Sequence, residues 1–425
     1  MNGDARSPAP PARPRTATAV AASLALAVGL AAAPVAAQPE WRVPPLLDGR
    51  LLVGGDVSAT MGSRDRGFYN HTDYDISLLR YVSVQFDAEW RVGDRASIVG
   101  QIRSENDHGV HASAWLVRLR PMARVPLTFE AGRLPHVFGQ ATNRRYGSDN
   151  PLIGLPLGYQ YLTSLRADSV ALSADALLRS RGRGWLLSYP QGLGSPDDAA
   201  GVPIVAALRW DTGVKATWDA GGIVEASLAL TVGSLSQPRV DDDNGGRQVA
   251  ARVVARPAAA LAIGMSAARG AYLADVARTA VAGYTGSARR DWYQSAVGAD
   301  VEWSLGHWLA RAEVLTSRWR TPRLARPLLP DHLDATSGMV EARYRVHPRA
   351  WLAGRAEHLW FSRITGTVFG GEATTWDAPV TRVEAGIGLL LTRQLVLKSS
   401  YQHAWRDAGR VRSPHLGAAQ LSFWF

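Results

Sequence analysis

The sequence predicts an all-β fold, a transmembrane antiparallel β-barrel of sixteen strands, with eighteen strands as the alternative. Three observations lead to this prediction. Long segments alternate between apolar and polar residues, the connections between them are alternately short and long, and the chain ends on the alternating segment Leu421-Ser422-Phe423-Trp424-Phe425. Successive side chains of a strand point to opposite faces, so each alternating segment has one apolar and one polar face.

Residues 1–37 are expected to be a cleaved secretory signal. A short arginine-containing segment precedes an apolar, alanine-rich stretch from Ala17 to Ala33, and Val35-Ala36-Ala37 supplies the small residues of a cleavage site. The mature chain would then be residues 38–425, and we expect all of it to belong to the barrel.

The composition fits an exported barrel. The chain has no cysteine, so a closed hydrogen-bonded wall rather than disulfides would hold it together. Its mean hydropathy is −0.09, a value that a barrel gives because lipid-facing and lumen-facing residues cancel. After Ala33 no segment approaches 18 uninterrupted apolar residues, so the sequence predicts no transmembrane helix.

The charge is basic and comes almost entirely from arginine. The formal net charge is +10, and losing three arginines and one aspartate with residues 1–37 would leave +8; Lys215 and Lys398 are the two lysines. An exported protein seldom meets nucleic acid. We therefore expect small anionic or polar solutes and anionic lipid head groups as partners, and no nucleic acid.

The first strands show the clearest pattern. An opening strand is expected at 49–60. In the next, 81–92, the even positions from Val82 to Val92 are apolar and the odd positions between them are polar. Gly93-Asp94 then predicts a tight turn into a strand at 95–105, which makes a hairpin.

Six further hairpins and a closing strand repeat this pattern. The expected pairs are 111–120 with 125–134, 210–218 with 223–233, 247–256 with 260–270, 293–304 with 308–319, 336–346 with 350–361, and 380–391 with 394–405, followed by 414–425. Seven short turns then alternate with eight longer connections, as in barrels with short turns at one end and long loops at the other. A soluble β-sandwich would explain the alternation but not the loop lengths. The eighteen-strand alternative arises because 169–172 and 184–189 could form one more hairpin.

The charged residues of the strands lie at the polar positions of the alternating pattern. A charge at the lipid-facing midplane costs about 2–4 kcal/mol, so this parity must face the lumen. The alternative to a role in selectivity is a wall of paired charges. The lumen-facing basic residues are Arg91, Arg103, Arg118, Arg120, Lys215, Arg311, Arg343, Arg345, Arg355, Arg382 and Lys398. The acidic ones are Asp87, Glu89, Glu105, Glu130, Asp211, Glu225, Asp300, Glu302, Glu313, Glu341, Glu357 and Glu384.

The connection 135–205 is much the longest. A loop of this length in a compact domain usually has a function. We expect it to fold into the lumen as a constriction, with its apolar stretch 151–157 against the wall or a neighbouring subunit and a short helix after Ser173. The alternative is a loop folded outward as a cap. The residues expected at the constriction are Arg144, Arg145 and Arg166 of the loop and Arg91, Arg103 and Arg118 of the wall.

A search of the sequence for enzyme and metal-binding motifs finds none that is complete. The chain has no phosphate-binding glycine loop, no His-Glu-x-x-His and no Gly-x-Ser-x-Gly. The segment Asp241-Asp242-Asp243-Asn244-Gly245 begins like a calcium loop, but its twelfth position is Arg252 rather than glutamate. We therefore expect no catalytic residues, no metal and no cofactor.

Short motifs along the chain give a resemblance to a known family. They are Gly49-Arg50-Leu51, Gly132-Arg133-Leu134-Pro135 with Phe138-Gly139, Gly298-x-Asp300 with Glu313, Tyr344-Arg345-x-x-Pro348 with Arg355, and Arg382-x-Glu384-x-Gly386. With its barrel pattern, the chain resembles bacterial outer-membrane porins, and most closely the phosphate-selective porin-like family. One departure is that such porins use lysine clusters as well as arginine.

The resemblance implies a location and partners. It implies the bacterial outer membrane, contact with its lipid, a homotrimer, and insertion by the barrel-assembly machinery, which would read the terminal Phe423, Trp424 and Phe425. The expected function is a porin for passive diffusion of small hydrophilic solutes, with a preference for anions. The alternatives are a plugged, non-conducting structural or adhesive barrel, and a sugar-type porin.

Overall fold

The computed structural model describes residues 44–425 except 64, 68, 71–80, 106–109, 123–124, 145–146, 208, 288–291 and 324–328. The predicted signal, residues 1–37, lies outside the described residues, so its cleavage stays a prediction.

Sixteen antiparallel strands form a closed barrel, as predicted. Each strand pairs with the strands before and after it in the barrel order, and the first pairs with the last. The strands are β1 (Leu51–Gly62), β2 (Tyr81–Arg91), β3 (Ala96–Glu105), β4 (His111–Leu119), β5 (Leu127–Leu134), β8 (Asp211–Ala220), β9 (Val224–Thr231), β10 (Gln248–Ala258), β11 (Leu261–Ala271), β12 (Tyr293–Leu305), β13 (Trp308–Arg320), β14 (His332–His347), β15 (Ala350–Phe361), β18 (Val380–Leu390), β19 (Leu395–Arg406) and β20 (His415–Trp424). Each corresponds to one predicted strand.

The chain terminus closes the barrel. Phe423 lies opposite Val57 in the pairing of β20 with β1. The backbone of Phe425 exchanges two hydrogen bonds with Gly55, of 3.1 and 3.2 Å. A Cβ atom at Gly55 would come within 2.7 Å of the Phe425 ring, so the ring lies directly over this glycine. The terminal aromatic therefore contributes both hydrogen bonds and packing to the seam, which leaves no free sheet edge.

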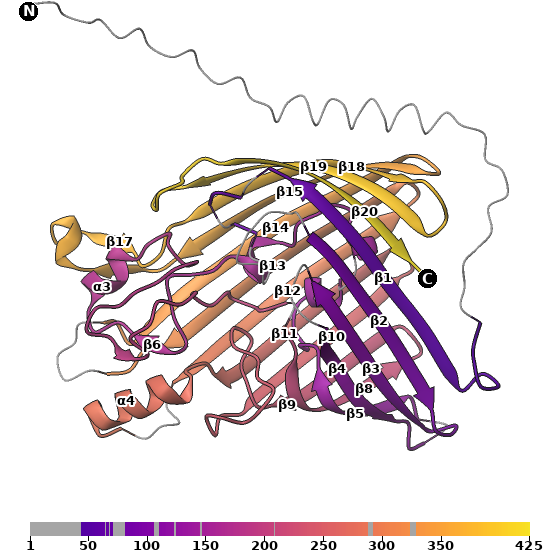
Figure 1. Ribbon diagram of the computed structural model, residues 1–425, viewed down its shortest axis with the longest axis horizontal. Coiled ribbons are helices and arrows are strands. Elements are labelled where there is room, and N and C mark those ends of the chain that lie inside the picture. Colours follow the sequence, from indigo (N-terminus) through magenta and orange to yellow (C-terminus); the bar gives the residue numbers. More distant parts are fainter. Residues whose placement is uncertain are drawn as a thin grey trace, which may run out of the picture.

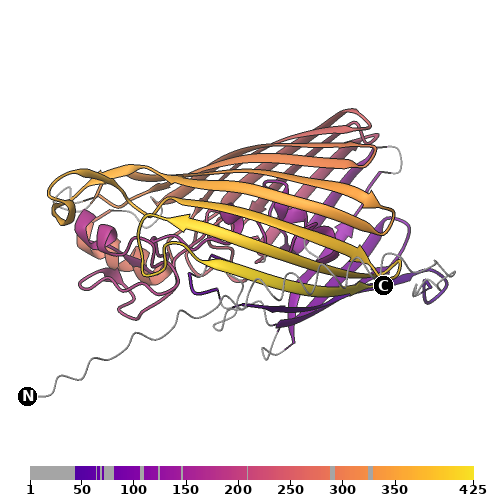
Figure 2. The ribbon, with the colours of Figure 1, turned by 90° about the horizontal axis from the view of Figure 1, so that it is seen from above.

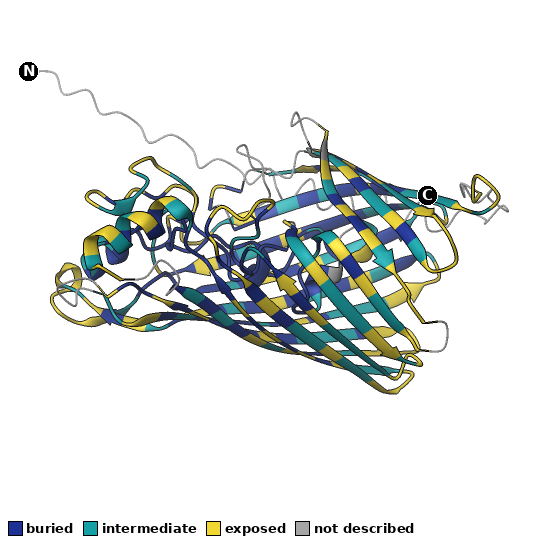
Figure 3. Cartoon of the chain, turned by 90° about the horizontal axis from the view of Figure 1, so that it is seen from below, coloured by how far each residue is buried: buried dark blue, intermediate teal, exposed yellow. Residues whose placement is uncertain are grey.

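The two faces of the wall differ as the sequence predicts. Along β2, Val84, Phe86 and Trp90 are exposed on the outside, while Ser83 and Gln85 are buried inside. Further exposed outward side chains such as Leu228 and Val314 continue the apolar outer surface around the barrel. Figure 3 shows this alternation as successive buried and exposed residues along the strands.

The long connections gather at one end of the barrel, which we call the loop end; the other is the turn end. Small elements lie in these connections: η1 (Ala141–Asn143), η2 (Gly147–Asp149), α2 (Leu157–Gln160), β6 (Ser169–Val170), α3 (Ala174–Arg179), β7 (Leu193–Gly194), α4 (Asp275–Thr285), β16 (Arg363–Thr365), η3 (Thr367–Phe369) and β17 (Ala373–Thr375). Figures 1 and 2 show α3, α4, β6 and β17 grouped at the loop end, opposite the C-terminus. No helix in the described part of the chain is both long and apolar enough to cross a membrane.

The helix predicted after Ser173 is confirmed. The Ser173 side chain accepts a hydrogen bond of 3.2 Å from the Ala176 amide, which caps the start of α3. Helix α4 was not predicted, because its segment was expected to be a loop throughout. Its Ala277 and Val281 are fully buried, so contacts with the other loops stabilise it.

The eighteen-strand alternative is wrong. β6 pairs with β7 in a separate two-stranded sheet, and residues 184–189 form no barrel strand. The reason is close irregular packing: a Cβ atom at Gly184 would come within 1.9 Å of the Leu162 carbonyl oxygen. Gly184, Leu187 and Tyr189 are buried, and this part of the chain packs among the loop segments instead of joining the wall.

An apolar core fills the loop end. Trp376, from the connection between β17 and β18, packs edge-on against Trp319 and Phe361 of the wall, with ring centres 6.0 and 5.0 Å apart. Tyr161 and Leu177 of the longest connection belong to the same buried cluster. The connections at this end therefore form one packed unit, which we call the cap.

Candidate functional site

The first part of the connection between β5 and β8, residues 135–210, enters the lumen, as predicted, and its later part, which includes Tyr161 and Leu177, belongs to the cap. We call the whole connection the inner loop. The Gly139 amide donates to Ser266 of β11 over 3.1 Å, and the Gln140 amide donates to Glu313 of β13 over 2.6 Å. These partners lie on the inward faces of the strands, so the first turn of the inner loop crosses the barrel interior.

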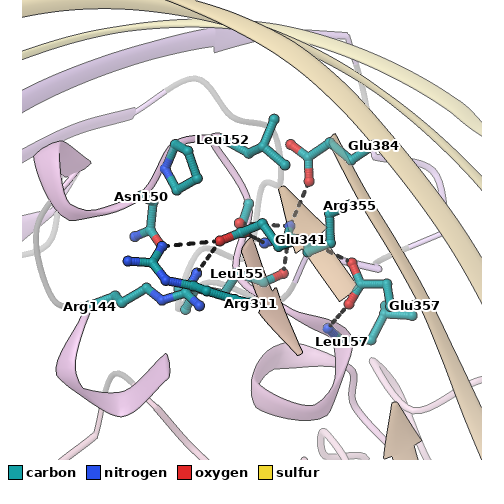
Figure 4. Close-up of polar contacts among 12 residues, drawn as sticks. Arg144, Asn150, Leu152, Leu155, Leu157, Arg311, Glu341, Arg355, Glu357 and Glu384 are labelled. Atoms are coloured by element: carbon teal, nitrogen blue, oxygen red, sulfur yellow. Dashed lines mark hydrogen bonds and ion pairs between the residues drawn. The ribbon is translucent and has the colours of Figure 1, made fainter. Parts of the chain in front are cut away.

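Glu341 of β14 is the centre of a charged cluster beneath the inner loop. Its Oε1 accepts from Arg144 of the inner loop at 2.8 Å and from Arg311 of β13 at 3.2 Å. Its Oε2 accepts from Arg355 of β15 at 3.3 Å. Figure 4 shows the three guanidinium groups converging on this carboxylate. One side chain thus joins three strands to the inner loop.

The cluster continues around Arg355. This residue also donates to Glu357 at 2.9 Å and to Glu384 at 2.6 Å, and to the carbonyl oxygen of Gly154 at 2.8 Å. Arg382 pairs with Glu357. We call the whole group the anchoring network: Arg144, Arg311, Glu341, Arg355, Glu357, Arg382 and Glu384. The four members on β15 and β18 have side chains that are 0% exposed, so their charges are balanced internally rather than by water.

Two further side chains hold the apolar stretch of the inner loop. Lys398 of β19 donates to the carbonyl oxygens of Gly147, Asn150 and Leu152. Trp351 of β15 donates to the Pro151 carbonyl oxygen over 3.1 Å. The stretch 151–157 therefore packs against its own barrel wall, the first of the two predicted positions.

A second charged group lies on the wall formed by β2 to β5 and β8. Arg118 of β4 donates to Glu89 of β2 at 3.0 Å and to Glu130 of β5 at 2.9 Å. Lys215 of β8 also pairs with Glu130. In contrast to the anchoring network, the Arg118, Glu89 and Lys215 side chains are 24, 21 and 18% exposed. These charges are therefore in contact with solvent.

The structure separates the predicted constriction residues into three groups. Arg91, Arg103 and Arg118 lie on the adjacent strands β2, β3 and β4; Arg91 is exposed and Arg103 is half-buried. Arg144 is buried in the anchoring network. Arg166 is fully buried within the inner loop, where it makes two bonds of 2.9 Å to Asp168. Arg145 lies outside the described residues.

Sequence reasoning missed the role of the anchoring residues. Glu341, Arg355 and Lys398 were placed on the lumen-facing parity, but the alternation alone gave no reason to single them out. No local signal could do so, because their partners on the inner loop lie 197 to 248 residues away in the sequence.

His136 lies at the start of the inner loop, and its burial leads us to predict that the folded protein loses stability in acid. Its ring is 7% exposed, and within the described residues neither ring nitrogen has a hydrogen-bond partner. Burial lowers the pKa of His136 to about 4. In the unfolded chain the ring has a pKa near 6.5, so between pH 6.5 and 4 the unfolded state binds a proton that the folded state does not. The free energy of unfolding is therefore unaffected above pH 6.5 and falls by up to about 3 kcal/mol as the pH drops towards 4.

Urea unfolding in detergent between pH 7.5 and 4 measures this effect. We expect His136→Leu to flatten the pH profile, and the exposed turn residue His347, changed to Leu, to leave it unaltered. An equally steep profile in His136→Leu would refute the assignment.

Comparison with known proteins identifies the barrel type. A loop-deletion variant of OmpT, an outer membrane protein of Vibrio cholerae, matches with a TM-score of 0.52 at 11% identity, covering 88% of this chain and 99% of its own. The outer membrane channel DcaP of Acinetobacter baumannii matches with a TM-score of 0.50 at 10% identity, covering 91 and 100%. Salmonella typhi OmpF in complex with daunomycin matches with a TM-score of 0.51 at 11% identity, covering 88 and 97%.

Sequence comparisons add no family. No protein-family model matches the chain, and no curated protein sequence matches it. At these identities the structural similarity shows the fold alone, which is a closed sixteen-strand barrel of the kind found in bacterial outer-membrane porins.

Proposed function

We propose that this protein lies in the bacterial outer membrane and lets small hydrophilic solutes, preferentially anions, diffuse through its lumen. The main support for this proposal is that two groups of charged side chains inside the barrel differ in solvent exposure. One is the buried anchoring network, and the other is the partly exposed group around Arg118. The apolar outer surface supports the location, because monomeric soluble proteins seldom expose contiguous apolar patches above a few hundred Å². Assignment to the phosphate-selective group stays a prediction.

The mechanism would be passive. Of the lumen-facing charges on this wall, Arg91, Arg103, Arg118 and Lys215 are exposed or half-buried, whereas the acidic Glu130 and Asp211 are buried. Such a surface lowers the electrostatic barrier for an anion, while the inner loop narrows the passage. Binding must stay weak so that the solute leaves. OmpT of Vibrio cholerae has been solved in a trimer form, which supports a homotrimer here as well.

Ion selectivity tests this proposal. At an effective dielectric close to that of water, one arginine changes the energy of an ion about 4 Å away by about 1 kcal/mol. Replacing Arg91, Arg103 and Arg118 with glutamine should therefore lower the anion-to-cation permeability ratio by about fivefold or more. The measurement is the reversal potential of single channels in a planar bilayer under a KCl gradient.

The matched control is the outward-facing Arg318, which pairs with Asp334. Arg318→Gln should leave the reversal potential unchanged. Unchanged selectivity in the triple variant would contradict the role of the wall arginines, and cation preference in the parent protein would contradict an anion channel.

A plugged, non-conducting barrel is the second candidate. The observation that favours it is the cap, in which loop and wall residues such as Tyr161, Trp319 and Trp376 form one buried core. Correctly folded protein that gives no single-channel current would establish this candidate in place of the first.

A further inference from the structure

Three arginines form a column on the inward faces of β13 and β14. Arg343 and Arg345 follow the buried Glu341 at alternate positions, so they share its inward face and lie nearer the turn end. Arg311 lies directly opposite Glu341 on the neighbouring strand. Arg343 is half-buried and Arg345 is exposed. The column therefore begins at the anchoring network and runs into the solvent-filled part of the lumen.

The acidic partners near this column are already engaged. Arg311 uses Glu302 at 2.7 Å and Glu341 at 3.2 Å, and Glu341 also binds Arg144 and Arg355. Across the part of the chain that the structure describes, neither Arg343 nor Arg345 has a carboxylate within 4 Å. Among the described residues, these two guanidinium groups therefore lack a carboxylate partner.

An aromatic ring fixes the position of Arg343. The Arg343 guanidinium carbon lies 5.9 Å from the centre of the Trp351 ring, within cation–π range. Trp351 is itself held by its hydrogen bond to the Pro151 carbonyl oxygen. The ring fits because residue 388 is glycine: a Cβ atom there would come within 2.1 Å of it. The cation is thus oriented before any ligand arrives.

We propose that Arg343 and Arg345, with Arg311 and Trp351, form an oxyanion-binding subsite on the turn side of the inner loop. The ligand chemistry is a carboxylate or phosphate group on a small solute, because two neighbouring guanidinium groups without carboxylate partners offer several N–H donors to such oxygens and bind them in a bidentate manner. This deepens the proposed function, on which it rests for its biological role. The subsite gives the permeating anion a defined position below the constriction.

Titration of the folded mature chain in detergent tests the subsite without requiring conduction. The probes are inorganic phosphate and acetate, each measured by calorimetry in a chloride background. A hydrogen bond to a charged group contributes about 1.5–3 kcal/mol, so the double variant Arg343→Gln/Arg345→Gln should bind the preferred probe at least about tenfold more weakly. Arg318→Gln, which removes one outward-facing arginine, should bind as the parent does.

The charge-conserving variant Arg343→Lys/Arg345→Lys separates geometry from charge. It should retain electrostatic attraction yet bind more weakly than the parent, because lysine lacks the planar fork of donors. Heat-modifiable electrophoretic mobility, the difference between unheated and boiled samples on a gel, checks that each variant is folded. Binding of phosphate alone or acetate alone supports the subsite and identifies the class of solute.

Two results would overturn the inference. One is a parent protein that binds neither probe, and the other is a double variant that binds as tightly as the parent. A protein that binds the probes through these arginines but carries no current would uphold the subsite while refuting the channel, so the two proposals can fail separately.

Discussion

Changing Glu341 to glutamine is expected to lower the free energy of unfolding of the barrel by about 3–5 kcal/mol, the cost of breaking a buried ion pair from one side. Arg311 would keep Glu302, and Arg355 would keep Glu357 and Glu384. Among the described residues, the Arg144 side chain would keep its 3.2 Å hydrogen bond to Gln140 and would have no ion pair. An arginine that is 6% exposed would then lose its ion pair, and the start of the inner loop should detach from the wall.

Urea unfolding in detergent measures the loss of stability, and single-channel recording should show a noisier current because the inner loop is less firmly held. The matched control is Glu225→Gln, since Glu225 and Arg256 are about 40% exposed and 3.6 Å apart. An exposed pair of this kind contributes no more than about 1 kcal/mol.

A double-mutant cycle identifies the partner. Arg144→Met together with Glu341→Gln removes the unpaired cation, so it should recover part of the stability lost in Glu341→Gln alone. Additive losses would mean that Arg144 and Glu341 act independently, contrary to the contact at 2.8 Å.

Changing Asp377 to alanine is expected to open the cap. Asp377, in the connection between β17 and β18, is fully buried and accepts four hydrogen bonds of 2.7–2.8 Å. Its donors are the amide and hydroxyl of Ser164 and the amides of Gly182 and Ala378. Leaving these buried donors without an acceptor should destabilise the cap by about 4 kcal/mol, at 1–3 kcal/mol for each donor that water does not reach.

Limited proteolysis measures this local effect, because cleavage within residues 160–205 should accelerate while the barrel stays resistant. Asp377→Asn, which keeps one acceptor oxygen, should give an intermediate rate. The control is Asp175→Ala in the same cap, whose carboxylate accepts from Thr367 and Val368 at a more exposed site and should matter less. Equal cleavage in both alanine variants would refute a specific role for Asp377.

The parts predicted well from sequence are those fixed by neighbouring residues. The alternation from Val82 to Val92 places six apolar side chains outside and the polar ones inside, whatever the rest of the chain does. The N-cap hydrogen bond of α3, between Ser173 and Ala176, likewise joins residues only three positions apart. Helix α4 was missed because the burial of Ala277 and Val281, which stabilises it, comes from distant segments.

The candidate site was predicted only in part for the same reason. The lumen-facing parity of Arg91, Arg103 and Arg118 follows from alternation, and the structure places them on adjacent strands. Exposure does not follow from alternation. Arg144 and Arg166 are arginines of one loop, yet both are buried against carboxylates, so we leave Arg166 out of the proposed lumen surface and assign Arg144 to the anchoring of the inner loop.

The amino-acid sequence is enough to predict a barrel, the face to which each strand residue points, the alternation of short turns and long loops, and a long loop suited to the lumen, with sixteen strands favoured over eighteen. These features depend on side-chain alternation and on spacing along the chain. The three-dimensional structure was needed to exclude eighteen strands and to show which charged side chains form ion pairs and which do not. Arg144 meets Glu341 across 197 positions, whereas Arg343 and Arg345 meet no carboxylate within the described residues. Closure of the barrel brings these groups together, and charge pairing depends on distance in space rather than along the chain.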